Sequence, residues 1–168
     1  MKTEHNFEIE RKWIVITPGV VFAIACAIKA FTKENEAVII QTPVYYPFKN
    51  MIDLNKRKCV TSSLIEKNGK YQIDFEDFEN KIEQNNVRLF ILCSPHNPVG
   101  RVWTVSELTR LAEICEKHNV IVFADEKLLL CEYRISYPST FWELFHSTVK
   151  PSSSGDNLRL LTICGIIL

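Results

Sequence analysis

A strand, a helix and a second strand follow one another in the middle of the sequence. The run VRLFILC, residues 87–93, is apolar enough to be a fully buried strand. The segment SELTRLAEICEKHN, residues 106–119, repeats apolar residues at helical spacing, and either Thr104 or Ser106 can cap it. VIVFADE, residues 120–126, is again strand-like. Two parallel strands joined by a helix form a βαβ unit with a right-handed crossover.

The rest of the chain alternates between strand-like and helix-like segments in the same way. The pattern predicts a short strand and turn at 13–19, helices after Gly19, Tyr46 and Asp74, strands at 37–43 and 58–66, and an Asn-Gly turn with a short strand within 68–74. Such alternation is typical of an α/β domain. We therefore expect a three-layer αβα sandwich with a mostly parallel sheet.

Composition narrows the class of protein. The 168 residues suffice for one domain with a real core, and the contents of 46% hydrophobic and 24% charged residues are those of a globular protein. Lys+Arg and Asp+Glu both number 20, so no basic excess points to nucleic acid or a membrane surface. The polar N-terminus does not resemble a signal peptide, and the apolar stretch 20–31 is too short to span a bilayer. These features predict a cytoplasmic protein.

The cysteines favour the same compartment. The six cysteines are scattered and form no C-x-x-C pair. Most lie in apolar runs, where cysteine behaves as a small hydrophobic residue. We expect reduced thiols rather than disulfides or metal ligands, and we predict no metal site.

Four segments of chemical interest follow expected strands, at the edge where open α/β sheets bind ligands. In the first, Thr17-Pro18-Gly19-Val20-Val21, the exposed N–H groups of a helix start favour a phosphate, although most such turns bind nothing. The second, Thr42-Pro43-Val44-Tyr45-Tyr46-Pro47, offers a tyrosine that stacks on a flat heteroaromatic ring or simply packs under the loop.

The third and fourth segments carry an amide and a carboxylate. In the third, Cys93-Ser94-Pro95-His96-Asn97-Pro98-Val99-Gly100, two prolines and a glycine fix the loop tightly, so Asn97 can be aimed at a ligand oxygen. His96 is a candidate base, but without a visible acidic partner an incidental role is favoured. Asp125 ends a buried strand, where a carboxylate is costly unless a cation such as a protonated pyridine nitrogen meets it. Alternatively Asp125 caps a turn, and the neighbouring Glu126 carries structural hydrogen bonds.

In this order the four segments resemble the class I/II aminotransferase superfamily of pyridoxal-phosphate enzymes, fold type I. Within it the chain is most similar to cystathionine beta-lyases of the MalY/PatB type. The likeness covers residues 13–126 and rests on TPGVV, QTPVYYPF, GKYQIDFEDFE, CSPHNPVGRVWT and the ADE strand end. It implies that residues 1–168 form part of the large, cofactor-binding domain, and that residues 127–168 are divergent.

The resemblance also implies roles for individual residues. Gly19, Val20 and Val21 would offer backbone amides to the phosphate of pyridoxal 5'-phosphate. Tyr45 would stack on the pyridine ring. Asn97 would hydrogen-bond the phenolic oxygen, and Asp125 would pair with the pyridine nitrogen.

The chain departs from the family pattern after Glu126. Leu128 stands where the family has a histidine, and Ser153 aligns with the lysine that forms a Schiff base with the cofactor. A serine hydroxyl cannot form an imine, so no catalytic residue is assigned; Lys150 is a weak substitute. The family's N-terminal segment and small domain have no counterpart, and the chain ends on the apolar run LLTICGIIL. We therefore expect an incomplete copy.

The resemblance implies carbon–sulfur beta-lysis of a sulfur amino acid such as cystathionine, in a family that is homodimeric. An aminotransferase would use the same residues, and nothing in the sequence separates the two reactions decisively. A third alternative is a non-catalytic pseudoenzyme fragment that retains at most cofactor binding.

Overall fold

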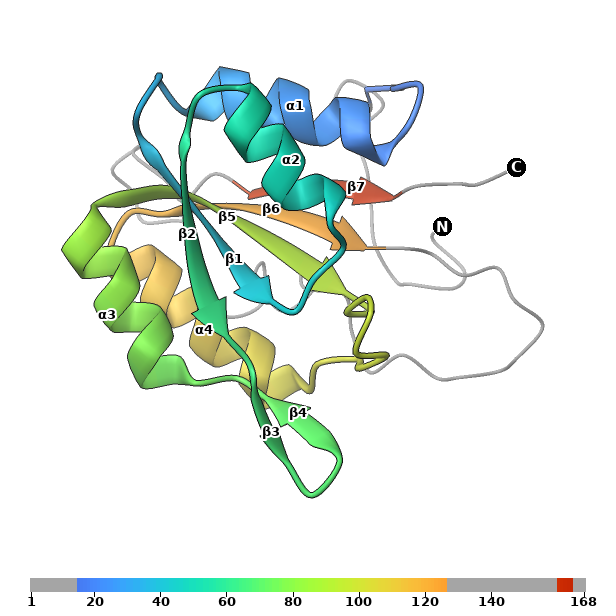
Figure 1. Ribbon diagram of the computed structural model, residues 1–168, viewed down its shortest axis with the longest axis vertical. Helices are drawn as coiled ribbons and strands as arrows, with labels where there is room; N and C mark the ends of the chain where they lie inside the picture. The colour runs from blue at the N-terminus through green and yellow to red at the C-terminus, as the bar shows by residue number, and fades with distance from the viewer. Residues whose placement is uncertain (1–14, 127–159, 165–168) are drawn as a thin grey trace, which may run out of the picture.

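A computed structural model describes residues 15–126 and 160–164. Its main sheet has the strand order β2-β1-β5-β6-β7, and every neighbouring pair is parallel (Figure 1). The strands are β1 (Ala37–Thr42), β2 (Lys58–Ser63), β5 (Val87–Ser94), β6 (Ile121–Glu126) and β7 (Leu160–Cys164). The predicted parallel sheet is therefore confirmed.

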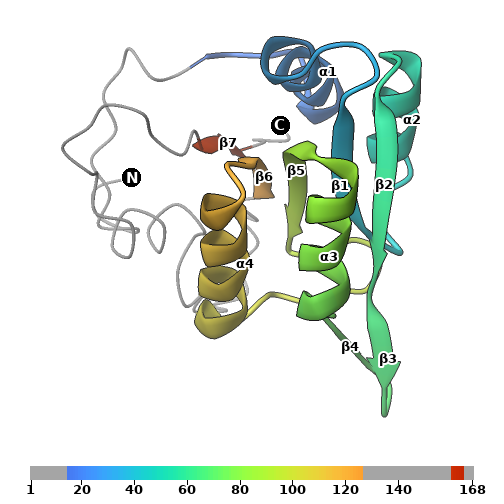
Figure 2. The same cartoon turned by 90° about the vertical axis from the view of Figure 1, so that its left-hand side faces the viewer.

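Helices cover both faces of this sheet. On one face lie α1 (Val20–Phe31) and α2 (Pro47–Leu54), and on the other lie α3 (Phe75–Asn85) and α4 (Val105–Lys117), which stand side by side in Figure 2. α2, α3 and α4 follow β1, β2 and β5, and each returns the chain to the opposite edge of the sheet, as parallel pairing requires. The expected three-layer αβα sandwich is confirmed.

Alternate residues of the strands feed two separate hydrophobic clusters. Ile39 and Phe90 face α3 and α4, whereas Ile40 and Ile91 face α1 and α2. This alternation follows from the two-residue period of a strand. The central strands are consequently apolar on both faces, and β5 reads as an almost unbroken hydrophobic run.

Side-chain caps define where α3 and α4 begin. The Asp74 carboxylate accepts the Asp77 N–H at 3.0 Å, as expected from the sequence. For α4 the sequence left two candidates, and the structure selects Thr104. Its hydroxyl accepts the Glu107 N–H at 3.3 Å while the Glu107 carboxylate accepts the Thr104 N–H at 2.8 Å, which is a complete capping box.

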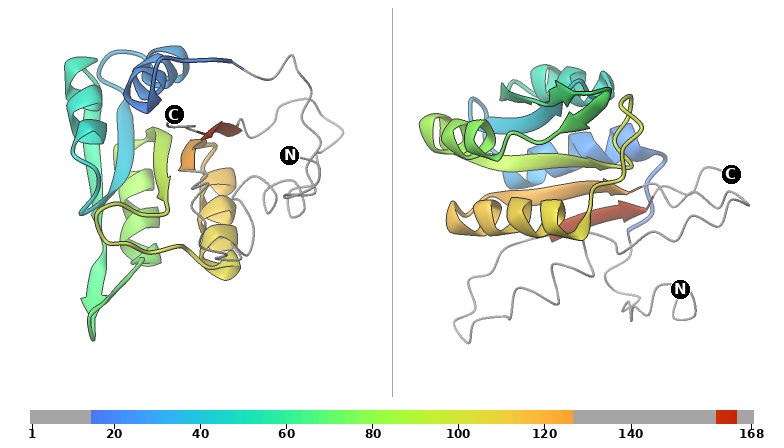
Figure 3. Two further views of the ribbon diagram at one scale, coloured as in Figure 1. Left: turned by 90° about the vertical axis from the view of Figure 1, so that its right-hand side faces the viewer. Right: turned by 90° about the horizontal axis from the view of Figure 1, so that it is seen from below.

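A two-stranded hairpin projects from one end of the molecule (Figure 3). It pairs β3 (Ile65–Lys67) with β4 (Lys70–Gln72) around Asn68 and Gly69, which both have positive φ, as the Asn-Gly turn predicted. The expectation of one strand over 58–66 is wrong, because the chain leaves the sheet at Leu64. The Leu64 N–H donates the last bond of the β1–β2 ladder, to the Thr42 carbonyl at 2.7 Å, and the Leu64 side chain is buried.

The strand expected at 13–19 is also wrong over its described part. Residues 15–19 form no strand, and Val15 and Ile16 are 81% and 94% exposed. Without a described neighbouring strand, the apolar pattern alone does not order this segment as β structure. None of the helices in the described ranges is long and apolar enough to cross a bilayer. Four cysteines, Cys26, Cys59, Cys93 and Cys115, are free thiols.

Candidate active site

The candidate site lies at the carboxyl edge of the sheet, on the face covered by α1 and α2. Val20, at the start of α1, and Tyr45, before α2, both pack against the cluster that includes Cys93 and Phe123. Asp125 is two residues beyond Phe123 on β6, so the strand period directs it to the same face. The fold therefore brings the ends of three elements that are distant in sequence to one place.

The first turn of α1 is open to an anion. Gly19 is its N-cap residue, and no side chain within the described residues caps the helix. Its first turn contains no acidic residue, whereas α3 and α4 both have a side-chain cap and an acidic first turn. A Cβ built on Gly19 would meet no atom of the described residues within 4 Å. Exposed N–H groups at a helix start, together with the helix dipole, suit a phosphate.

Tyr45 stands between the end of β1 and the start of α2. The residue is half-buried, and its ring packs edge-on against Phe48, with centroids 6.0 Å apart, and at a tilt against Tyr46, with centroids 5.6 Å apart. Phe48 is fully buried, so Tyr45 rests on a fixed support. The ring is thus packed on one side and partly accessible. Its position is compatible both with stacking on a ligand ring and with simple packing under the loop.

Asn97 sits at the tip of a closed loop after β5. The Gly100 N–H donates to the His96 carbonyl at 2.7 Å, and the His96 N–H donates to the Arg101 carbonyl at 2.6 Å. The Cys93 sulfur accepts the Asn97 N–H at 3.5 Å, so the loop folds back over the strand end. The Ser94-Pro95 and Asn97-Pro98 peptide bonds are cis. Asn97 is exposed, so its amide is available to a ligand.

Asp125 is next to this loop. It pairs in register with Cys93 across β5 and β6, so the residue that holds Asn97 is also the neighbour of Asp125. Asp125 and the adjacent Glu126 are 5% and 7% exposed. A buried carboxylate requires compensating interactions, which makes Asp125 a suitable partner for a cationic ring nitrogen.

His96 lies on the other face of the sheet. Its ring is 1% exposed and packs edge-on against Trp103, with centroids 5.2 Å apart, and Trp103 belongs to the cluster under α3 and α4. Its Nε2 atom is 2.9 Å from the Pro43 carbonyl oxygen. Burial lowers the pKa of His96, an effect that hydrogen bonding to the Pro43 carbonyl only partly offsets. The ring is therefore neutral at neutral pH and is not placed to act as the base at the candidate site.

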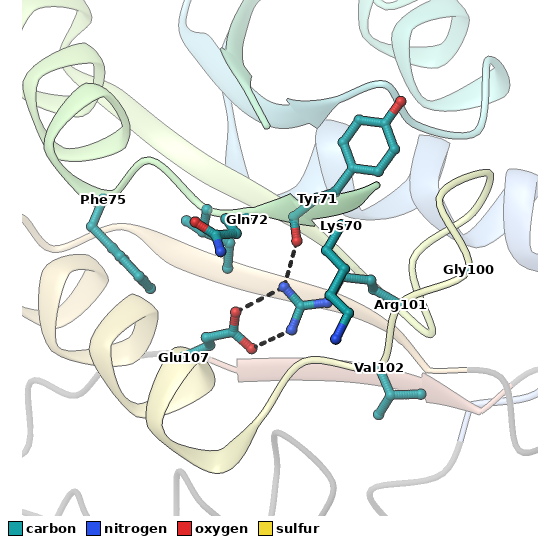
Figure 4. A pocket seen from close by; sticks show the side chains of 9 residues that line it. Lys70, Tyr71, Gln72, Phe75, Gly100, Arg101, Val102 and Glu107 are labelled. Carbon is teal, nitrogen blue, oxygen red and sulfur yellow. Dashed lines mark hydrogen bonds and ion pairs between the residues drawn. The ribbon is translucent and has the colours of Figure 1, made fainter. Parts of the chain in front are cut away.

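An ion pair anchors the same loop to α4. Arg101 donates two hydrogen bonds to the Glu107 carboxylate, at 3.0 and 2.9 Å, and one to the Tyr71 carbonyl of β4 at 2.6 Å (Figure 4). Burial alone would raise the pKa of Glu107, but hydrogen bonds from Thr104 and Arg101 lower it below its ordinary value. The hollow around this pair, about 570 Å³, borders the hairpin and α4, away from the candidate site.

The sequence did not identify the residues that hold the Asn97 loop from the α3 and α4 side of the sheet. The Trp103 indole N–H donates to the Cys93 carbonyl at 3.0 Å, and its ring also receives the Arg101 guanidinium at 4.6 Å. The Thr104-x-x-Glu107 spacing was the available signal for the anchor at α4. The predicted Schiff-base position Ser153, the substitute Lys150 and the altered position Leu128 lie outside the described residues.

Known proteins are similar to this chain in sequence and in fold. The profile of the family "Aminotransferase class I and II" matches residues 1–127. Cystathionine beta-lyase PatB of Bacillus subtilis is 44% identical over 126 residues, which are 75% of this chain and 33% of that protein. The chain thus spans about a third of the length of the curated relatives it matches.

Two solved structures have the same architecture. A putative aminotransferase from Clostridium difficile, solved with pyridoxal phosphate bound, has a TM-score of 0.71 and 48% identity, covering 74% of this chain and 32% of that one. A pyridoxal-phosphate-bound C–S lyase from Staphylococcus hominis has a TM-score of 0.80 and 31% identity, covering 85% and 37%. The match of the family profile over most of the chain, with these relatives, establishes that this protein belongs to the aminotransferase class I and II family.

Proposed function

We propose that this chain provides the cofactor-binding part of a cytoplasmic, pyridoxal-phosphate-dependent carbon–sulfur beta-lyase that acts on sulfur amino acids such as cystathionine. The observation that supports the proposal is that Val20 of the α1 start, Tyr45 and Cys93 share one cluster, and that Cys93 both accepts the Asn97 N–H and pairs in register with Asp125. The 44% identity to a cystathionine beta-lyase supports the choice of reaction.

Each residue has a distinct task in this proposal. Backbone N–H groups of Gly19, Val20 and Val21 bind the cofactor phosphate. The Tyr45 ring lies against the pyridine ring, and the Asn97 amide donates to the phenolic oxygen. The buried Asp125 carboxylate holds a proton on the pyridine nitrogen, because an ion pair away from water favours the charged form of both partners.

The chemistry belongs to the cofactor. When bound, pyridoxal phosphate supplies a ring that accepts electrons from the substrate's α-carbon, and the protein orients and tunes that ring. Carbon–sulfur cleavage also needs an amine that removes the α-proton. Lys150 is the candidate for it within the divergent segment 127–168, where Ser153 occupies the aligned position. The family resemblance implies a homodimer, which we propose as the working assembly.

Titration of the full chain with pyridoxal phosphate tests cofactor binding, with quenching of intrinsic fluorescence as the readout. We expect Asn97→Ala to weaken binding about tenfold, the loss expected for a hydrogen bond to a charged oxygen. Asn80→Ala, on the exposed side of α3, is the matched control and should bind like the wild type. No binding by the wild type, or equal binding by Asn97→Ala, would overturn the proposal.

A second measurement separates the three activities. Release of pyruvate from cystathionine indicates the lyase, whereas amino-group transfer to a keto acid indicates an aminotransferase. Cofactor binding without either product indicates a non-catalytic cofactor-binding chain. Borohydride reduction followed by peptide mass spectrometry tests Lys150 directly, because only a lysine joined to the cofactor acquires its reduced mass.

A further inference from the structure

A single side chain joins the two loops that carry the candidate cofactor-facing residues. His96 precedes Asn97, and its Nε2 atom is 2.9 Å from the carbonyl oxygen of Pro43, which precedes Tyr45 by two positions. These loops follow β5 and β1, which are neighbours in the sheet. The His96 contact therefore ties the loop that carries Asn97 to the loop that carries Tyr45.

The protonation of His96 follows from this contact. A carbonyl oxygen can only accept a hydrogen bond, so Nε2 must carry the proton. Nδ1 has no hydrogen-bond partner among the residues that the structure describes. The neutral ring with its proton on Nε2 is thus the expected state, because Nε2 then donates to the Pro43 carbonyl and Nδ1 carries no buried charge. The Pro43 carbonyl in turn gains a buried donor.

The ring has little freedom to move away from Pro43. Its edge-on contact with Trp103 closes one side, and Trp103 is itself 1% exposed and bonded to the Cys93 carbonyl. The backbone of His96 is held at both its N–H and its carbonyl within the closed loop. At the other end of the contact, Tyr45 is supported by the fully buried Phe48. The hydrogen bond therefore links two rigid bodies.

We propose that His96 is a positioning residue: its Nε2–H bond to the Pro43 carbonyl sets the separation of Asn97 and Tyr45 so that both engage one cofactor ring. This inference rests on the proposed function, since it presupposes that the two residues share a ligand. His96 itself does not touch the cofactor, because its ring lies on the α3 and α4 side of the sheet.

The pair His96→Gln and His96→Met tests the hydrogen bond in the full chain. The two side chains have the same length, but only glutamine can donate to Pro43. We expect pyridoxal phosphate to bind His96→Met about fivefold more weakly than His96→Gln, the ratio expected for one hydrogen bond. Inorganic phosphate, which needs only the start of α1, should bind both variants equally. General loss of structure would weaken both ligands, so this difference is specific to positioning.

A double-mutant cycle shows through which residue His96 acts. Combined with Asn97→Ala, the two His96 variants should bind pyridoxal phosphate equally, because the residue being positioned is gone. Equal binding of the two variants while Asn97 is intact, or a difference that persists in Asn97→Ala, overturns this inference, and the proposed function still stands if Asn97→Ala alone weakens binding. If the wild type does not bind pyridoxal phosphate, the proposed function fails first.

The wild-type protein provides a measurement that does not depend on folding of the variants. In a ¹⁵N–¹H spectrum of histidine side chains, His96 should be protonated on Nε2, and exchange of that proton with solvent should slow when pyridoxal phosphate is added. A proton on Nδ1, or an exchange rate that the cofactor leaves unchanged, overturns the inference.

Discussion

The Arg101 guanidinium and the Glu107 carboxylate face each other in a two-point ion pair, with N–O distances of 3.0 and 2.9 Å. Both side chains are largely buried, at 24% and 19% exposure, so the pair is more than a surface contact. Glu107 also closes the capping box of α4. One carboxylate thus joins the loop of the candidate site to a helix start.

The two tasks of Glu107 can be separated by substitution. Glu107→Gln keeps an acceptor for the Thr104 N–H but loses the charge that pairs with Arg101. Glu107→Ala loses both. We expect the free energy of unfolding, measured by urea denaturation, to fall by about 1 kcal/mol for glutamine and about 2 kcal/mol for alanine. Equal losses would mean that the cap acceptor contributes nothing beyond the ion pair, and no loss for glutamine would mean that the ion pair contributes nothing.

The pH dependence of stability should report the buried His96. Its pKa is lowered in the folded protein from the ordinary value of 6.5, so below pH 6.5 the unfolded chain takes up a proton that the folded chain does not. The free energy of unfolding therefore falls as the pH drops, with a slope approaching about 1.4 kcal/mol per pH unit, the value for one proton.

The variant His96→Gln isolates this effect. Glutamine does not titrate. Between about pH 6.5 and about pH 5, where histidine takes up its proton, the free energy of unfolding from urea denaturation should therefore depend less steeply on pH in this variant than in the wild type. Glu107 does not interfere there, because its pKa is lowered and its contribution is lost only below its ordinary value of 4.5. Identical slopes would show that His96 titrates alike in both states.

A negative charge in the first turn of α1 should compete with the cofactor phosphate. Phe22 is 54% exposed and lies in that turn, so Phe22→Glu disturbs little packing. We expect Phe22→Glu to weaken pyridoxal phosphate binding about threefold to tenfold relative to Phe22→Gln, which removes the same aromatic ring without adding charge. The glutamate should also stabilise the helix by about 0.5 kcal/mol through its dipole. Equal affinities would place the phosphate elsewhere.

The cysteines should differ sharply in reactivity. Cys26 is exposed, whereas Cys115 is fully buried and burial raises the pKa of its thiol. Iodoacetamide followed by peptide mass spectrometry should modify Cys26 in the native protein. Cys115 should react on the order of a thousandfold more slowly until denaturant is added, because thiolate formation requires opening of the core. Rapid native modification of Cys115 would contradict the packing of α4.

The sequence predicted the architecture well where local pattern and packing agree. The helix starts at Asp74 and the Asn68-Gly69 turn rest on local hydrogen bonding and backbone preference, and both are confirmed. The break at Leu64 was not predictable from pattern, because residues 58–66 keep strand-like composition on both sides of it. β1, the strand that β2 pairs with, ends at Thr42, so the Leu64 N–H makes the last bond of that ladder.

The candidate site divides in the same way. Asn97 and Asp125 were identifiable because strand ends and proline-rich loops mark ligand edges in α/β folds. The link from His96 to Pro43 spans 53 positions and depends on which strands are neighbours, information that no local pattern contains. The roles of the cofactor-facing residues themselves remain predictions, to be decided by the binding experiments.

The sheet acts as a partition. Residues proposed to contact the ligand lie on one side, while Trp103 and the Arg101–Glu107 pair, which hold the loop in place, lie on the other. A saturation screen for cofactor affinity should therefore find many sensitive positions that no bound molecule can reach. Drift on that hidden side would erode binding while every recognisable ligand-facing residue stayed intact.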